Sequence, residues 1–234
     1  MSFMVGPPPT SGYSGTLLND LVSWWTMDDA SGDRLDSHGS NDLDSTFKTV
    51  GYVAGHISGA GDFPGSGAGL YTLLTPHGLQ AGARSFALSL WIEFDALGTQ
   101  IPIQCGSGGL ASNNDWLLEH SASRLRFYVP DGGVWKIAVA NTFGAPTTAT
   151  YYHVYGQYDY STGVIGISIN NGTLDTVAGP ATPNDAGYGV GFGVGVGAYF
   201  NGRMDEIAFW ATRVLTTDER TELYNGGAGI GYPG

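Results

Sequence analysis

The chain has 234 residues, enough for one large β domain, and its 38 glycines with only 13% charged residues favour many turns and a weakly charged surface. Nine Lys and Arg residues against 21 Asp and Glu residues give a net charge of −12, which argues against nucleic acid and against an anionic membrane surface as partners. No apolar stretch reaches the length of a membrane span, so we expect no membrane insertion.

The first 19 residues have the composition of a linker. They contain Pro7-Pro8-Pro9 and the Ser- and Gly-rich run from Ser11 to Gly15, which predicts a flexible N-terminal arm over residues 1–19. Met1 to Gly15 also lacks the basic start and the apolar stretch of a signal peptide, so we expect no export by the general route. One globular domain is predicted for residues 20–234.

Short strands separated by turns follow from residue 21 onward. Residues 85–94 alternate between apolar side chains on one face, from Phe86 to Phe94, and a mixed face that includes Trp91. Cys105, the single cysteine, lies in an apolar run, which excludes an internal disulfide and predicts a buried side chain. Within residues 188–197 every second residue is glycine, which predicts a strand that carries no side chains on one of its faces. The pattern indicates an all-β, antiparallel two-sheet jelly-roll β-sandwich.

One short C-terminal helix completes this pattern. Thr216 and Glu219 have the spacing of a capping box, and Gly226 is placed where a helix end favours positive φ. The strand before the helix, residues 202–210, carries Asp205 and Glu206 next to each other. Strict alternation would point these two carboxylates to opposite faces, where they cannot form a catalytic pair.

Several blocks in this order resemble the concanavalin A-like lectin/glucanase superfamily, in particular its laminin-G-like branch. The resemblance covers about residues 20–227 and is carried by residues 21–32, 36–43, 61–63, 85–91, 152–154 and 202–207. It implies a jelly roll in which the first and last strands are adjacent. It does not fix a function, because this fold carries lectins, glycosidases, adhesins and virion parts.

The sequence has one near match to a catalytic motif. Glycosidases of this superfamily that resemble laminarinases carry Glu-x-Asp-x-x-Glu on one strand, and Glu93-Phe94-Asp95 fits its first half. Gly98 stands where the second glutamate is expected, so the acid/base is missing. We therefore predict a protein that is not an enzyme, with a glycoside hydrolase that takes its acid/base from elsewhere in the chain as the alternative.

A structural calcium ion is the cofactor that the resemblance suggests. Asp36 to Asp42 is a polar, Gly-containing loop, and oxygen-rich loops suit calcium. Resemblance to laminin-G-like and pentraxin-like members implies Asp36, Asn41 and Asp205 as ligands. In the alternative interpretation, Asp36 and Asn41 form side-chain turns and Asp205 accepts backbone N–H groups.

A carbohydrate-binding platform is the third candidate. Sugars bind aromatic side chains through their apolar ring faces and polar side chains at their edges. The residues predicted to face away from the core are Trp91, Arg126, Tyr128, Lys136, His153, Tyr155 and Gln157, of which we expect Trp91, Tyr128, His153, Tyr155 and Gln157 to bind the sugar if their strands share a sheet. The alternative is that loops or a neighbouring subunit cover that face.

These observations predict a non-enzymatic, lectin-like structural or binding module. By resemblance it looks like a phage virion protein, either a capsid decoration or a tail or fibre component. It would contact virion proteins and host-surface glycans, as a homo-oligomer or as part of a large assembly, with the arm docked on a neighbour. The alternative is a bacterial carbohydrate-binding adhesin at the cell surface or outside the cell.

Overall fold

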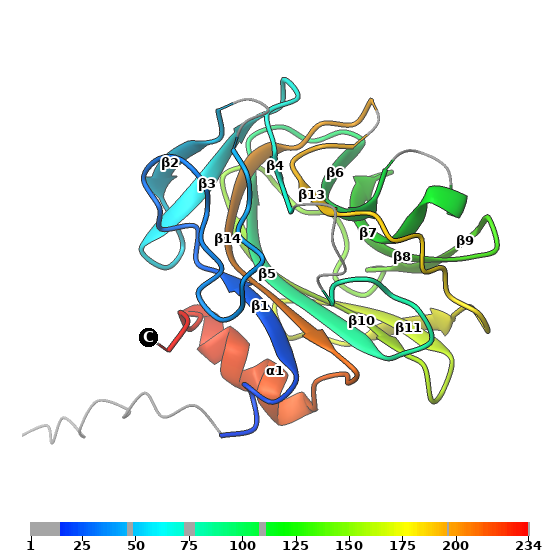
Figure 1. Cartoon of the computed structure of the whole chain (residues 1–234). Coiled ribbons are helices and arrows are strands. Elements are labelled where there is room, and N and C mark those ends of the chain that lie inside the picture. Colours follow the sequence, from blue (N-terminus) through cyan, green and yellow to red (C-terminus); the bar gives the residue numbers. More distant parts are fainter. Residues whose placement is uncertain (1–14, 46–48, 73–77, 108–110, 196, 234) are drawn as a thin grey trace, which may run out of the picture.

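Two antiparallel β-sheets pack face to face, and one helix lies outside them (Figure 1). The computed structural model describes residues 15–45, 49–72, 78–107, 111–195 and 197–233. This architecture confirms the predicted all-β sandwich with a short C-terminal helix. Of the residues predicted as an arm, 1–14 lie outside the described part, and 15–19 form turns on the domain.

The larger sheet contains the first and the last strand of the chain. Its order is β12-β11-β10-β5-β14-β3-β2, and β1 also pairs with β14. Its strands are β1 (Leu21–Trp25), β2 (Gly51–Ala54), β3 (Gly59–Pro64), β5 (Phe86–Phe94), β10 (Tyr151–Asp159), β11 (Val164–Ile169), β12 (Asp175–Ala178) and β14 (Asn201–Ala211). The expected adjacency of the first and last strands is thus confirmed.

The smaller sheet has the order β4-β13-β6-β7-β8-β9. Its strands are β4 (Leu70–Tyr71), β6 (Gln100–Gly106), β7 (Asn114–Ser121), β8 (Arg124–Asp131), β9 (Val134–Val139) and β13 (Val190–Phe192), and the short 3-10 helix η1 (Ala111–Asn113) precedes β7. The strand predicted over residues 188–197 is therefore too long. Gly193, with a φ of +77°, turns the chain away after Phe192.

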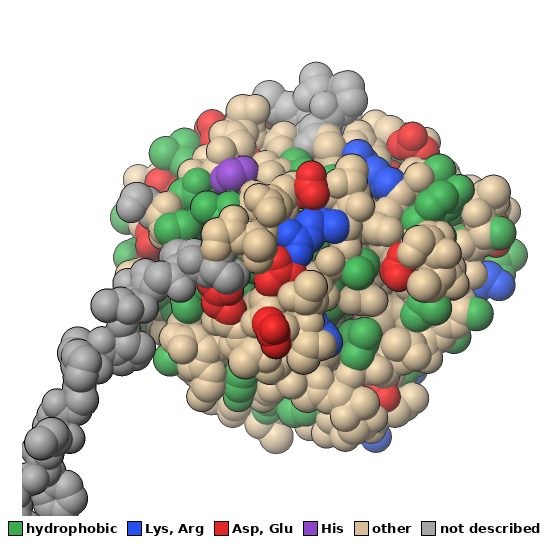
Figure 2. Space-filling view, turned by 90° about the horizontal axis from the view of Figure 1, so that it is seen from below, with side chains coloured by type: hydrophobic (Ala, Val, Ile, Leu, Met, Phe, Trp, Pro, Cys, Tyr) green, Lys and Arg blue, Asp and Glu red, His purple; other side chains and the backbone are tan. Residues whose placement is uncertain are grey.

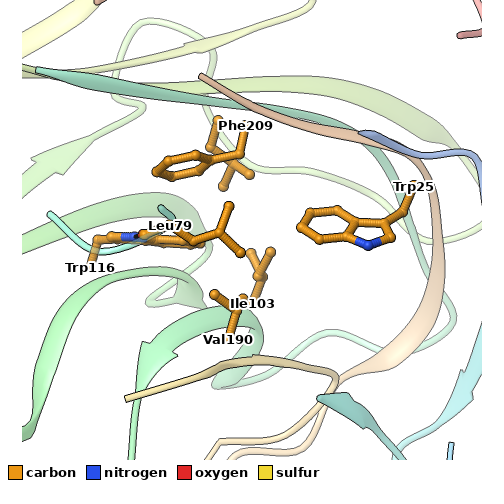
Figure 3. A pocket seen from close by; sticks show the side chains of 7 residues that line it. Trp25, Leu79, Ile103, Trp116, Val190 and Phe209 are labelled. Atoms are coloured by element: carbon orange, nitrogen blue, oxygen red, sulfur yellow. Dashed lines mark hydrogen bonds between the residues drawn. The ribbon is translucent and has the colours of Figure 1, made fainter. Parts of the chain in front are cut away.

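The hydrophobic core lies between the inner faces of the two sheets. The apolar face predicted for residues 85–94 lies in it, and so does Cys105, whose thiol pKa is raised by burial. A gap between the sheets, shown in Figure 3, is too small for a water molecule and is lined by Trp25, Leu79, Leu88, Ile103, Trp116, Val190 and Phe209. Burial of such surface, at about 25 cal/mol per Å², dominates the stability.

Helix α1 (Thr217–Tyr224) packs on the outer face of the larger sheet beside β1 (Figure 1). The predicted capping box between Thr216 and Glu219 is present in full. The C-cap residue Asn225 is left-handed, and Gly226 after it has the predicted positive φ, +62°. A second apolar cluster lies beneath the helix and includes Leu17, Trp24, Tyr155, Trp210, Leu215 and Leu223. Across the described residues, no helix has the length and apolar character needed to cross a membrane.

Candidate functional site

The residues predicted as one sugar platform lie on two different sheets. Trp91 belongs to β5, while His153, Tyr155 and Gln157 belong to β10, and these two strands pair in the larger sheet. Tyr128 belongs to β8, in the smaller sheet. The condition for a common surface, that all these strands share one sheet, is not met, because alternation tells which side of a strand faces outward but not which sheet holds the strand.

The larger-sheet residues of this set are covered by the chain itself. The hydroxyl of Tyr155 donates to Gln157 Oε1 at 2.9 Å and accepts the N–H of Leu215 at 3.0 Å, and Tyr155 is 1% exposed. Trp91, 3% exposed, stacks with His56, with ring centroids 3.7 Å apart, and also with Tyr224 of α1. This face was expected to be open to a sugar or covered by loops or a subunit; helix α1 and the segment after it are the cover.

The outside of this cover is seen in Figure 2, which looks onto the side of the molecule that carries α1. Uncharged polar side chains and backbone make up most of the view, and hydrophobic side chains form small separate groups.

Beneath the helix, His153 is 2% exposed and its Nε2 lies 2.8 Å from Ser89 Oγ. Burial lowers the pKa of His153 to about 3, so its ring is neutral at physiological pH.

The carboxylate predicted to begin a calcium site, that of Asp36, is occupied by backbone groups. It accepts the N–H groups of Trp24, His38, Gly39 and Asn41 at 2.9 to 3.1 Å. The side chain of Asn41 donates to Ser23 Oγ at 2.7 Å. These bonds fit the alternative in which Asp36 organises a turn.

Asp205 lies on β14, whereas the Asp36 loop lies along the opposite edge of β1. The N–H of Trp24 donates to Asp36 and its carbonyl accepts from Ser37, so these groups of β1 point away from β14. The described residues contain no group of three or more His, Cys, Asp or Glu side chains arranged to hold a metal. The calcium ion stays a prediction, and one observation fits it: Asp205 Oδ1 is buried without a hydrogen-bond partner.

A β-bulge brings the side chains of Asp205 and Glu206 to the same face. The pairing of β14 with β5 shifts between Asp205 and Ala208, and Glu206 has a φ of +47°. Met204 and Ile207 on either side both enter the core, which leaves the two carboxyl groups outside it. The expectation that they point to opposite faces is therefore wrong.

Both carboxyl groups of this bulge are buried, Asp205 against the loop at residues 55–57 and Glu206 against the C-terminal segment. Oδ2 of Asp205 accepts the N–H of Ile57 at 2.8 Å, and Glu206 accepts the indole N–H of Trp24. Burial is the main cause that raises the pKa of each group to about 8, and the neighbouring Asp28 raises both further. Because the two side chains are 0% and 4% exposed, they are closed to a substrate.

The carboxylates of the partial glycosidase motif are engaged in ion pairs. Glu93 pairs with Arg203 across β5 and β14, and Asp95 lies 3.4 Å from the same guanidinium group. Asp62 on β3 approaches Arg203 from the other side at 3.9 Å. The nucleophile position of the motif is thus bound to a cation, and Gly98 still provides no acid/base.

The outer face of the smaller sheet is partly open to solvent and aromatic. A third apolar cluster there contains Ile101, Leu117, Tyr128 and Ala198, with the partly exposed Trp135 and Ile137 packed against it. The rings of Tyr128 and Trp135 meet edge to face, with centroids 5.3 Å apart. Tyr128 is 8% exposed and Trp135 is partly exposed, so the ring surface left for the apolar side of a sugar is that of Trp135.

Polar groups border these rings. The hydroxyl of Tyr128 donates to Glu119, and burial together with this bond raises the pKa of Tyr128 to about 12. Arg126 is the cross-strand neighbour of Glu119, and its Nε is buried without a partner. Gln104 Oε1, on the next strand, is likewise buried and unpaired. Arg126 is partly exposed and can therefore offer its guanidinium group to a hydroxyl-rich ligand, whereas Gln104, 6% exposed, is closed to one.

Trp135 is the residue of this face that the sequence analysis missed. Lys136 was expected to face outward, but it pairs with Val129, whose side chain lies in the core. Trp135 pairs with Pro130 and therefore shares the outer face with Tyr128. The alternation of Trp135 and Ile137 was the available signal.

The family assignment follows from a comparison of the sequence with known families. The sequence profile described as "Concanavalin A-like lectin/glucanases superfamily" matches residues 66–219. The chain belongs to this superfamily. The resemblance seen in the sequence is thereby confirmed, and the lectin-like jelly-roll fold of this superfamily is the one described above. No curated protein sequence matches the chain.

Several solved structures share this fold at low identity. The binding domain of Paraclostridial Mosquitocidal Protein 1 superposes with a TM-score of 0.71 at 14% identity, over 90% of this chain and 53% of that chain. Domain 4 of AbnA, an extracellular arabinanase from Geobacillus stearothermophilus determined with arabinotriose, gives 0.63 at 17%, over 87% and 97%. Trypanosoma rangeli sialidase gives 0.61 at 15%, over 89% and 33%. The chain thus spans about half of the mosquitocidal chain and a third of the sialidase.

Proposed function

We propose that this superfamily member is a non-catalytic carbohydrate-binding module whose site is the outer face of β7, β8 and β9. The observation that carries the proposal is the partly exposed Trp135 ring, which meets the buried Tyr128 edge to face, with the partly exposed Arg126 on the same sheet face. One sugar ring would lie with its apolar side on the Trp135 indole, and hydroxyl groups of a neighbouring ring would meet Arg126 further along the same face.

The smaller sheet is favoured as the site because the other places for a sugar are filled. The outer face of the larger sheet is occupied by α1 over Tyr155 and by the following segment over Trp91. The gap in the core admits no water molecule, so a sugar would have no place between the sheets (Figure 3). The carboxylates of the strand motif are bound to Arg203, which favours a binding role over a hydrolytic one.

The test is a glycan array read with the full chain and two variants. Trp135→Ala removes the proposed stacking surface, and we expect it to lower binding by tenfold or more, a loss of about 1.4 kcal/mol. Tyr52→Ala is the matched control, because Tyr52 is an exposed ring on β2 of the other sheet. Equal loss in both variants, or binding unchanged in Trp135→Ala, would contradict the proposal.

We further propose that the module acts in a phage virion, as a capsid decoration or a tail or fibre component, alone or as a homo-oligomer among virion proteins. The resemblance to virion proteins of this fold supports this placement, and an adhesin at a bacterial surface is the alternative. Finding the chain in purified virions at a fixed copy number would support it, and its absence from them would refute it. Hydrolysis of a polysaccharide panel, repeated with Glu93→Gln, tests the glycosidase alternative.

A further inference from the structure

The positive charges of this acidic protein are distributed unevenly. Nine Lys and Arg residues oppose 21 acidic residues, and one of the nine, Lys48, lies outside the described part. Arg203 and Arg213 are in ion pairs, Arg34 and Arg84 donate to backbone carbonyls, and Arg220 lies over the ring of Tyr155. The remaining three, Arg124, Arg126 and Lys136, lie on β8 and β9, and none of them is in an ion pair within the described residues.

Two of these three share the face that carries Tyr128 and Trp135. Arg124 and Arg126 are two residues apart on β8, in register with Tyr128, so all three side chains leave the sheet on the same side. Arg124 donates one guanidinium N–H to the carbonyl of Ser123 at 2.8 Å. The Nε of Arg126 has no partner, although it is buried.

The acidic groups beside this face form no ion pair with Arg124 or Arg126, and the side-chain contact of Arg126 is a hydrogen bond with the Tyr128 hydroxyl. Glu119 lies opposite Arg126 on β7, but its carboxylate accepts the hydroxyl of Tyr128 and forms no ion pair with Arg126. Asp131, at the end of β8, accepts the hydroxyl of Thr182 at 3.1 Å. A planar guanidinium group binds a carboxylate through two parallel hydrogen bonds, which adds both energy and orientation.

We infer that the saccharide recognised on this face is acidic, an oligosaccharide of uronate-type sugars in which one carboxylate binds Arg126, with Arg124 adding charge, while a neighbouring ring lies on Trp135. This inference rests on the proposed carbohydrate-binding function and specifies its ligand class. A net charge of −12 repels anions at long range, so an acidic sugar gains nothing from the protein as a whole and depends on these two arginines.

The experiment pairs acidic and neutral sugars of the same shape. Oligosaccharides of galacturonate, glucuronate and mannuronate, and their neutral galactose, glucose and mannose counterparts, are titrated calorimetrically into the full chain. We expect at least one uronate series to bind tenfold or more tightly than its neutral counterpart. Arg126→Gln should remove most of that difference, whereas Arg220→Gln, an equal charge change on α1 over the other sheet, should leave it in place.

The outcomes distinguish the carbohydrate-binding function from the acidic nature of the ligand. If uronates and neutral sugars bind equally, and Trp135→Ala abolishes both, the carbohydrate-binding proposal stands and the acidic ligand is wrong. A neutral preference, or an acidic preference that survives Arg126→Gln, also overturns the inference. If no sugar of either series binds, both the inference and the function on which it rests are contradicted.

Discussion

Tyr155→Phe tests whether Tyr155 is structural, as its place under α1 indicates. The hydroxyl accepts the N–H of Leu215 at 3.0 Å and donates to Gln157 at 2.9 Å, and both contacts are buried. The substitution leaves the Leu215 N–H without an acceptor in a region that water does not reach, which costs about 1–3 kcal/mol. For a chain of this size each kcal/mol lowers the melting temperature by about 2–4 °C. Denaturant titration and thermal melting measure both quantities.

The matched control is Tyr160→Phe, because Tyr160 is 42% exposed at the end of β10. We expect this variant to stay within about 0.5 kcal/mol of the unchanged protein. Glycan binding should be the same in both variants, since Tyr155 lies on the sheet opposite the proposed site. Unchanged stability of Tyr155→Phe together with a loss of glycan binding would refute the structural reasoning and return Tyr155 to the sugar site.

Three further predictions concern the C-terminal part of the chain. Thr216→Ala removes half of the capping box and should cost about 1 kcal/mol in denaturant unfolding, while an unchanged midpoint would contradict it. The folded-state pKa values of Asp205 and Glu206, about 8, lie above their usual range, so protonation of these groups stabilises the folded protein. This contribution to the free energy of unfolding is complete below about pH 4 and is lost as the pH rises through 8. Unfolding in chelator from pH 4 to 9 should show this fall, with a smaller slope in Glu206→Gln. Millimolar calcium should raise the melting temperature if Asp205 binds it, and Asp205→Asn should remove the shift; a shift that persists would exclude Asp205 as the ligand.

Much of the fold is predictable from the sequence because local patterns determine it. Alternation identified the inner face of β5 from Phe86 to Phe94, and the Thr216–Glu219 spacing identified the start of α1. Both depend on contacts within a few residues. The bulge at Glu206 was missed because its extra residue breaks the alternation without a glycine or proline to mark it.

The site was harder to predict because it depends on long-range pairing. Alternation correctly turned Trp91, Tyr128 and Tyr155 away from the core, but sheet membership depends on β5 pairing with β10 and β14, far away in the sequence. The cover over Tyr155 comes from α1, some 60 residues later. Trp135 was missed because the register of the β8–β9 hairpin, and with it the face of Lys136, is set by the turn at residues 131–134.

Backbone hydrogen exchange with and without a bound glycan tests the central claim most directly, because it locates the site without any substitution. With the tightest-binding sugar of the array at saturation, we expect increased protection in β7, β8 and β9, over residues 114–139, and unchanged exchange in α1 and in the segment up to residue 233. Protection confined to α1, the C-terminal segment or the outer face of β10 would contradict the account.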